Sequence, residues 1–135
     1  MNLKIGQIAE TTKTFTTEDV ILFSQVSTDT NPIHLNQSYA ENTVFKNPIC
    51  HGFLVGSLIS AVIANKLPGN GSIYIEQNLL FRRPVFHNDT ITAKVEITEI
   101  IEEKKIVKLN TICKNQNGEI VIEGNAILKV PFLHD

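Results

Sequence analysis

The stretch HGFLVGSLISAVIANKL, residues 51–67, decides the fold of this chain. It is apolar on nearly every side when wound as a helix, and a helix of that kind is buried. The Pro-Gly-Asn-Gly run at 68–71 predicts where the helix ends. Its apolar part is interrupted by Gly56, Ser57 and Ser60 and is shorter than the ~20 residues that cross a bilayer. We therefore predict a buried central helix in a protein that has no membrane partner.

Four antiparallel strands are predicted after this helix, at 72–81, 91–98, 107–113 and 119–130. Alternation of apolar and polar side chains is clearest in the second strand, and Asn117-Gly118 is a strong hairpin signal before the last one. An apolar sheet face needs a cover, and the helix at 51–67 is the only candidate. The predicted fold class is α+β, a curved antiparallel sheet wrapped around one long buried helix.

Smaller elements are predicted before the central helix. A weak alternation over 6–15 predicts a short first strand. A capping box that starts at Thr16 predicts a helix from about 17 to 26. Asn36 and Ser38 are alternative caps for a further short turn of helix.

Length and composition fit one globular domain over residues 1–135. The chain has 135 residues, 42% of them hydrophobic, and a formal net charge of −2. It has no basic run, which argues against a nucleic-acid partner. No secretory signal is recognisable, so Cys50 and Cys113 are expected to be free thiols in a reducing compartment. We expect a soluble cytoplasmic protein.

The most polar and most punctuated segment is STDTNPIH, residues 27–34, which we interpret as a shaped loop. Pro32 lacks an N–H and disfavours helical backbone at Asn31, so no regular helix is predicted there. Such a loop presents Asp29 and His34 from nearby points of the backbone. A carboxylate beside an imidazole is an acid/base pair that works near neutral pH.

This order of elements and motifs resembles the hotdog fold of the MaoC-like hydratases, and most of all the short R-specific enoyl-CoA hydratases. The similar motifs are an acid-x-Asn-Pro-aliphatic-His segment, a His-Gly step, a Leu-Pro-Gly stop and a Phe-x-x-Pro-Val segment, here at 29–34, 51–52, 67–69 and 81–85. The similarity covers almost the whole chain. Many family members have Gly before the acid, where this chain has Thr28. This difference affects the backbone of the loop but leaves the acid and the histidine in place.

The resemblance implies that the protein adds water to trans-2-enoyl-CoA and forms (R)-3-hydroxyacyl-CoA, without a cofactor. It implies that Asp29 and His34 hold and activate the water, with His34 as the proton acceptor, and that the Gly52 N–H binds the thioester oxygen. Amides at a helix N-terminus are unpaired, and one such donor contributes about 3 kcal/mol to transition-state binding. Polyhydroxyalkanoate precursor supply, fatty-acid breakdown and fermentation all fit this reaction.

The substrate-binding residues that we expect are Asn31, His51, Ser60, Ile63, Arg82 and Ile127. By resemblance, Ser60, Ile63 and Ile127 surround the acyl tail, and their size favours short chains. An alternative for Ser60 is a hydrogen bond back to the preceding helical turn. Arg82, with Arg83 beside it, is a candidate for the CoA phosphates or part of a solvated sheet edge.

Other functions stay open at this point. A hotdog acyl-CoA thioesterase would direct a carboxylate-activated water at the thioester carbonyl, although the Asn-Pro-Ile-His segment favours hydration. A non-catalytic acyl-CoA-binding module has no need of both Asp29 and His34, which in a bland interpretation only hold the loop. A metal on Asp29, His34, Cys50 and His51 is not expected, because no ligand pair has helical or zinc-finger spacing.

The sheet also predicts an oligomer. A single sheet on one helix leaves edges that invite pairing. Hotdog domains join two sheets edge to edge, so the resemblance implies a homodimer with each active site near the interface.

Overall fold

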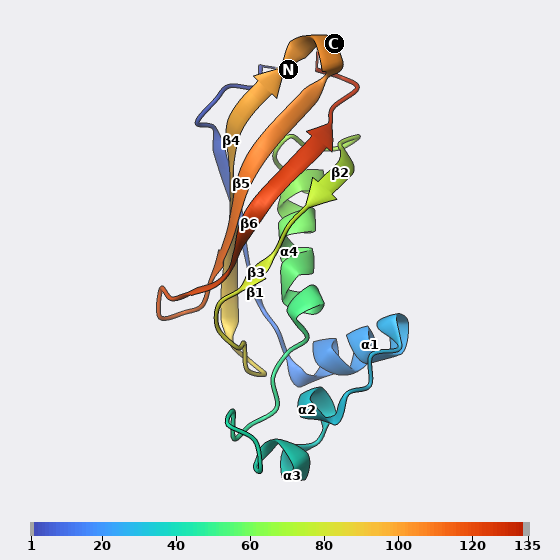
Figure 1. Ribbon diagram of the computed structural model, residues 1–135, viewed down its shortest axis with the longest axis vertical. Helices are drawn as coiled ribbons and strands as arrows, with labels where there is room; N and C mark the ends of the chain where they lie inside the picture. Colours follow the sequence, from blue (N-terminus) through green and yellow to red (C-terminus); the bar gives the residue numbers. More distant parts are fainter. Residues whose placement is uncertain (1, 134–135) are drawn as a thin grey trace.

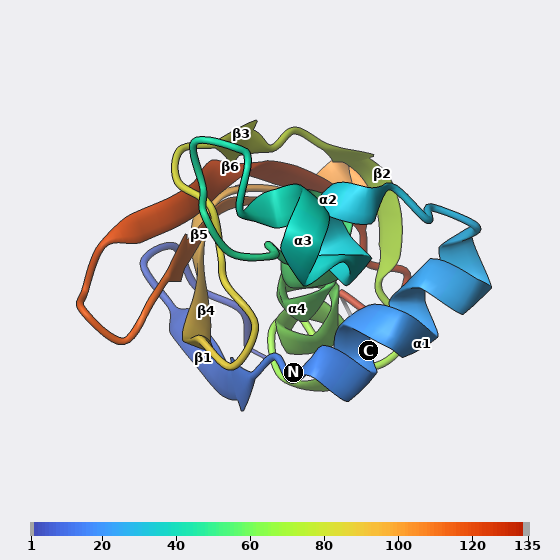
Figure 2. The ribbon, with the colours of Figure 1, turned by 90° about the horizontal axis from the view of Figure 1, so that it is seen from below.

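The computed structural model describes residues 2–133, which form one curved antiparallel sheet wrapped on one long helix (Figure 1). The helices are α1 (Thr17–Ser27), α2 (Pro32–Leu35), α3 (Gln37–Ala40) and α4 (Gly52–Asn65), with a 3-10 turn η1 (Glu102–Lys104). The strands are β1 (Ile8–Thr14), β2 (Ile73–Gln77), β3 (Leu80–Phe81), β4 (Thr90–Ile101), β5 (Ile106–Lys114) and β6 (Ile120–Lys129). The short helices α1, α2 and α3 gather at the end of the molecule where α4 begins (Figures 1 and 2).

The sheet has the strand order β1-β4-β5-β6-β2, and β3 pairs with β6 off this path. Its centre is the long antiparallel set β4, β5 and β6, in which Val95 lies opposite Thr111 and Thr111 lies opposite Gly124. The predicted alternation in the first of these strands is confirmed, since its fully buried residues are Ile91, Ala93, Val95 and Ile97. The buried face of the sheet packs on α4, and β1 and β2 form the two edges.

The central helix α4 lies inside the predicted range 51–67. Its buried residues are Leu54, Val55, Leu58, Ile59, Val62 and Ile63. The prediction that it is buried on every side is wrong, because Phe53 is 71% exposed and Ser57 and Ser60 are also exposed. The cause is geometric, since one sheet curves around one side of α4 and the short helices lie beyond its first turn (Figure 2). None of the helices in residues 2–133 is long and apolar enough to cross a membrane.

Side-chain caps set the starts of α1 and α3. Thr16 Oγ1 accepts from the Asp19 N–H at 3.2 Å, and the Asp19 carboxylate accepts from the Thr16 N–H at 3.0 Å. The predicted capping box is therefore confirmed, and its bond from the Thr16 N–H lowers the pKa of the Asp19 carboxyl. Asn36, rather than Ser38, caps α3, because its side-chain oxygen accepts from the Tyr39 N–H at 2.9 Å.

The prediction that residues 27–34 contain no helix is wrong at their end, where α2 forms a single turn. Pro32 is its first residue, a position where the missing N–H has no intrahelical partner in any case. Asn31 keeps the non-helical backbone that a following proline favours, and its side-chain oxygen accepts from the Ile33 N–H at 3.2 Å. The proline thus begins a helix instead of preventing one.

The single strand predicted over 72–81 is divided into β2 and β3. Asn78 separates them, donating its N–H to the Asn125 carbonyl at 3.0 Å while its side-chain oxygen accepts from the Asn125 N–H. On β6, Gly124 has no Cβ, and one placed there would collide with the Asn78 carbonyl. The glycine therefore lets the neighbouring backbone approach and break the strand.

Candidate active site

Local bonds place Asp29 in the turn between α1 and α2. Thr28, which ends α1, has φ 65° and ψ 9°, the left-handed backbone that glycine adopts without strain. Asp29 then donates its N–H to Ser27 Oγ at 3.1 Å, and its carboxylate accepts from the Asn31 N–H at 3.3 Å. The carboxylate is held close to the start of α2 and stays exposed to solvent. Thr28 therefore takes the backbone that a glycine would take.

The hydrogen bonds of His34 determine which ring nitrogen is basic. Its Nδ1 lies 2.8 Å from the Ile49 carbonyl oxygen. A carbonyl only accepts, so Nδ1 carries the hydrogen and the neutral ring has its lone pair on Nε2. Nε2 of His34 has no hydrogen-bond partner within residues 2–133, yet it is not among the buried atoms there that lack one, a description that fits His51 Nδ1. Nε2 of His34 is therefore open to water. His34 thus presents a base at the edge of a nearly buried ring.

The surroundings of His34 keep this base neutral. Burial lowers the pKa of His34 below its usual value, because it penalises the charged ring. The Ile49 carbonyl and the Asp29 carboxylate act in the opposite direction, whereas the nearby His51 and His87 rings also lower the pKa. At neutral pH the ring is therefore able to accept a proton.

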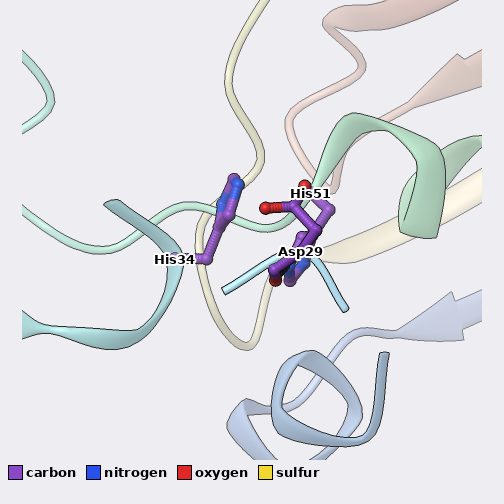
Figure 3. Close-up of side chains that lie close together, drawn as sticks. All are labelled: Asp29, His34 and His51. Atoms are coloured by element: carbon purple, nitrogen blue, oxygen red, sulfur yellow. Dashed lines mark hydrogen bonds between the residues drawn. The ribbon is translucent and has the colours of Figure 1, made fainter. Parts of the chain in front are cut away.

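Asp29, His34 and His51 come together from the α1–α2 turn, from α2 and from the residue before α4 (Figure 3). One carboxylate oxygen and one nitrogen of each ring all lie within 4.8 Å of one another. The two rings are stacked, with centroids 3.9 Å apart and 27° between their planes. A ligating lone pair lies in the ring plane, so two nearly parallel rings do not converge on one tetrahedral ion. The geometry favours an acid/base site over a metal centre.

A cavity of about 530 Å³ opens beside His34 at the N-terminus of α4. Gly52 lines it as the first residue of α4, and within residues 2–133 its N–H has no hydrogen-bond partner. A Cβ at Gly52 would lie 2.5 Å from Phe81 Cε1, so the packing of Phe81 already favours glycine there. The cavity joins the basic nitrogen of His34 to an unpaired amide at the positive end of a helix dipole.

The family follows from comparison with known proteins. A family model described as MaoC like domain matches residues 3–118. The chain belongs to the MaoC-like family. It is 47% identical over 130 residues to an (R)-specific enoyl-CoA hydratase of Rhodospirillum rubrum, covering 96% of this chain and 90% of that protein.

Relatives of nearly the same length support the whole fold. An (R)-specific enoyl-CoA hydratase of Aeromonas caviae is 42% identical over 130 residues, covering 96% of this chain and 97% of that protein. The solved structure of the A. caviae (R)-hydratase involved in PHA biosynthesis has a TM-score of 0.93 at 43% identity, covering 96% of this chain and 98% of that one. The predicted MaoC-like family and hotdog fold are both confirmed.

In this MaoC-like chain the predicted substrate-binding residues do not all reach the cavity. Arg82 lines it, with Nε 3.2 Å from a Glu123 carboxylate oxygen. His51 is only 2% exposed and lies behind His34 instead of lining the cavity. Asn31 acts locally as the cap of α2.

Of the three residues predicted around an acyl tail, two lie on α4 and one lies on β6. Ser60 is on the exposed side of α4, and Ile63 is buried on the same helix. On β6, Ala126 and Leu128 are fully buried, so Ile127 between them points to the opposite face of the sheet. Within one chain the structure does not bring Ile127 to Ser60 and Ile63, because strand residues alternate between faces.

Two residues that support the site were missed by the sequence interpretation. His87 Nε2 donates to the His34 carbonyl at 2.9 Å, and its Nδ1 lies 3.0 Å from Thr17 Oγ1. Ser24, buried on α1, has its Oγ 3.1 Å from His51 Nε2. Both partners are distant in the sequence, and no local spacing indicates them.

The two cysteines are free, as predicted, and both are buried. Burial raises the pKa of the Cys50 thiol to about 12 and that of Cys113 to about 12. Cys50 lines the cavity but is a protonated thiol at neutral pH, so it is no ready nucleophile.

Proposed function

We propose that this chain is an R-specific enoyl-CoA hydratase that adds water to trans-2-enoyl-CoA and forms (R)-3-hydroxyacyl-CoA reversibly. The single observation that carries the proposal is the bare Nε2 of His34, open to water beside the Asp29 carboxylate. A non-catalytic binding module does not need this arrangement of base and acid. The identity to (R)-specific enoyl-CoA hydratases over nearly the full length supports the same reaction.

The reaction follows from these groups. A water between Asp29 and His34 gives its proton to His34 Nε2 as its oxygen bonds to C3 of the enoyl group. The electron pair of the double bond moves toward the thioester oxygen, where the Gly52 N–H and the α4 dipole stabilise the developing charge by about 3 kcal/mol per donor. Asp29 orients the water and takes part in proton transfer to the α-carbon. The proton taken up by His34 passes through Asp29 to this carbon, so that the product forms and both residues return to their starting protonation states.

Conservative substitutions of the two reacting residues test this function. Asp29→Asn and His34→Gln nearly preserve the volume of the side chain. Asp29 is exposed in a turn and His34 lies in the one-turn helix α2, so we expect both variants to fold. Each should lower the kcat for crotonyl-CoA hydration by at least about 10²-fold. The double variant should be little worse than either single one, because both residues act on one water. A folded single variant that keeps more than about a tenth of kcat would contradict this mechanism.

The crotonyl-CoA assay also separates the alternative functions. Loss of the enoyl absorbance without free thiol supports hydration. Release of free thiol instead supports an acyl-CoA thioesterase. Binding without either change supports an acyl-CoA-binding module, and coupling to an R-specific dehydrogenase reports the configuration of the product.

We propose that Arg82 meets the CoA phosphates at the cavity mouth, with Asn31 keeping the turn that carries Asp29 in place. Arg82 is half-exposed, and its ion pair with Glu123 is a surface pair that a phosphate can replace. Ser60 and Ile63 are proposed to surround a short acyl tail from α4. Ile127 is not part of this proposal, because it faces away from α4.

We propose a cytoplasmic homodimer joined along β2. This strand is a sheet edge, and its Ile73 and Ile75 are each 56% exposed. Unpaired backbone beside exposed apolar side chains is a template for a second strand. Phe53 on the exposed side of α4 adds apolar surface. The free thiols fit a reducing cytoplasm.

A further inference from the structure

His51 makes one set of contacts that fixes its protonation. Its Nε2 lies 3.0 Å from the Asp29 carbonyl oxygen and 3.1 Å from Ser24 Oγ. The carbonyl only accepts, so Nε2 carries the hydrogen, and Ser24 Oγ accepts a share of the same hydrogen. The lone pair of the neutral ring is therefore on Nδ1. That Nδ1 is the buried side-chain atom without a partner in residues 2–133. His51 therefore donates to the backbone of the residue that carries the acid.

The ring of His51 is also packed between two others. On one side it stacks on His34 with centroids 3.9 Å apart, and on the other the edge-on contact with Phe23 has centroids 4.9 Å apart and 62° between planes. His51 is 2% exposed and does not line the cavity. It touches both halves of the acid/base pair without reaching the substrate.

We propose that His51 is a positioning residue for the acid/base pair: its Nε2–H holds the Asp29 backbone, its ring orients the His34 imidazole, and Ser24 orients His51. The proposal rests on the hydratase function and deepens it. Holding reacting groups within a fraction of an ångström matters because a misplacement of about 1 Å can cost 10²-fold in rate. A ring clamped by two packing partners and two hydrogen-bond partners is suited to that precision.

The surroundings of the His34 and His51 rings decide which of the two accepts the proton. Three titratable groups lie near the His34 and His51 rings. Asp29 lies in the turn before α2, His87 donates a hydrogen bond to the His34 carbonyl, and Cys50 precedes His51 in the chain. A proton on His34 Nε2 meets water, whereas a proton on His51 Nδ1 would be buried without an acceptor. The proton of the attacking water therefore goes to His34.

Three substitutions separate the two contacts of His51. His51→Phe keeps a flat ring but loses the donor, His51→Gln keeps a donor but loses the ring, and His51→Leu keeps neither. We expect His51→Leu to lower kcat for crotonyl-CoA by about 10²-fold with a much smaller change in KM. His51→Phe and His51→Gln should each recover part of that loss. Ser24→Ala should lose less than His51→Leu, and Ser38→Ala on exposed α3 is the matched control, with unchanged kcat.

A folded His51→Leu variant with wild-type kcat would overturn the proposal, as would Phe and Gln variants that fold yet recover nothing. If His51→Leu does not fold, Ser24→Ala and ¹⁵N NMR of the imidazoles decide. We expect the His51 ring to carry hydrogen on Nε2, because the Asp29 carbonyl beside it only accepts. A His51 ring without hydrogen on Nε2 refutes the inference even if the enzyme is active. An inactive wild type would instead refute the hydratase function and leave this NMR test valid.

Discussion

The glycine at the start of α4 allows a test that separates packing from catalysis. In Gly52→Ala the new methyl would lie 2.5 Å from Phe81 Cε1 and 2.8 Å from Cδ1. Carbon atoms in contact normally sit ~3.5–4.0 Å apart, so the ring must retreat by about 1 Å. Overpacking of this size costs about 1–3 kcal/mol in a rigid core. Phe81 is 52% exposed and free to move outward, so we expect the low end, a loss of about 1 kcal/mol in the free energy of unfolding.

Activity should respond more strongly than stability. The methyl stands beside the amide that we propose binds the thioester oxygen, and loss of one such donor lowers kcat by about 10²–10³-fold. We therefore expect Gly52→Ala to unfold in denaturant near the wild type while its kcat for crotonyl-CoA falls by about 10²-fold.

The double variant Gly52→Ala/Phe81→Leu completes the test. The smaller leucine removes the collision, so the free energy of unfolding should return to that of Phe81→Leu alone. Its kcat should stay at least about 10-fold below that of Phe81→Leu, because the methyl still covers the amide. If the double variant instead has the kcat of Phe81→Leu, glycine is needed only to make room for the ring. The oxyanion role of Gly52 would then be refuted.

Three further outcomes are expected. The pKa of His34 is lowered and its neutral form is the active one, so kcat/KM should hold its neutral-pH value down to about pH 6.5 and fall only below that pH. A pH profile with its midpoint above about pH 6.5 would contradict the assignment of His34 as the base. Light scattering at micromolar concentration should report twice the 15.1 kDa of one chain, and a mass of one chain would reject the pairing of β2. Ile63→Ala should shift the preference toward longer acyl chains by about 10-fold or more, and an unchanged chain-length series would remove Ile63 from the proposed pocket.

Periodicity predicted the elements that bury apolar surface. The range 51–67 contains α4, and the alternation over 91–98 lies within β4. These predictions succeed because the same side chains both set the pattern and fill the core. The Thr16 cap succeeds for a similar reason, since all of its partners are within three residues.

The failures have local causes that composition does not reveal. Pro32 was interpreted as a helix breaker, but its role depends on whether it is the first residue of a helix or an inner one. The break at Asn78 depends on the partner strand, where Gly124 admits the backbone of its neighbour. The exposed side of α4 follows from the curvature of a single sheet, which an apolar pattern does not encode.

The site was predictable only in part, because its chemistry depends on main-chain carbonyls. Three imidazoles each donate one N–H to a carbonyl, His34 to Ile49, His51 to Asp29 and His87 to His34. Those acceptors fix every tautomer, yet a carbonyl is present at every residue and leaves no trace in a sequence. The remaining lone pairs then differ in use: that of His87 lies at the Thr17 hydroxyl, and that of His51 is buried without a partner. Only the lone pair of His34 is left for water, so the fold selects one base among three similar rings.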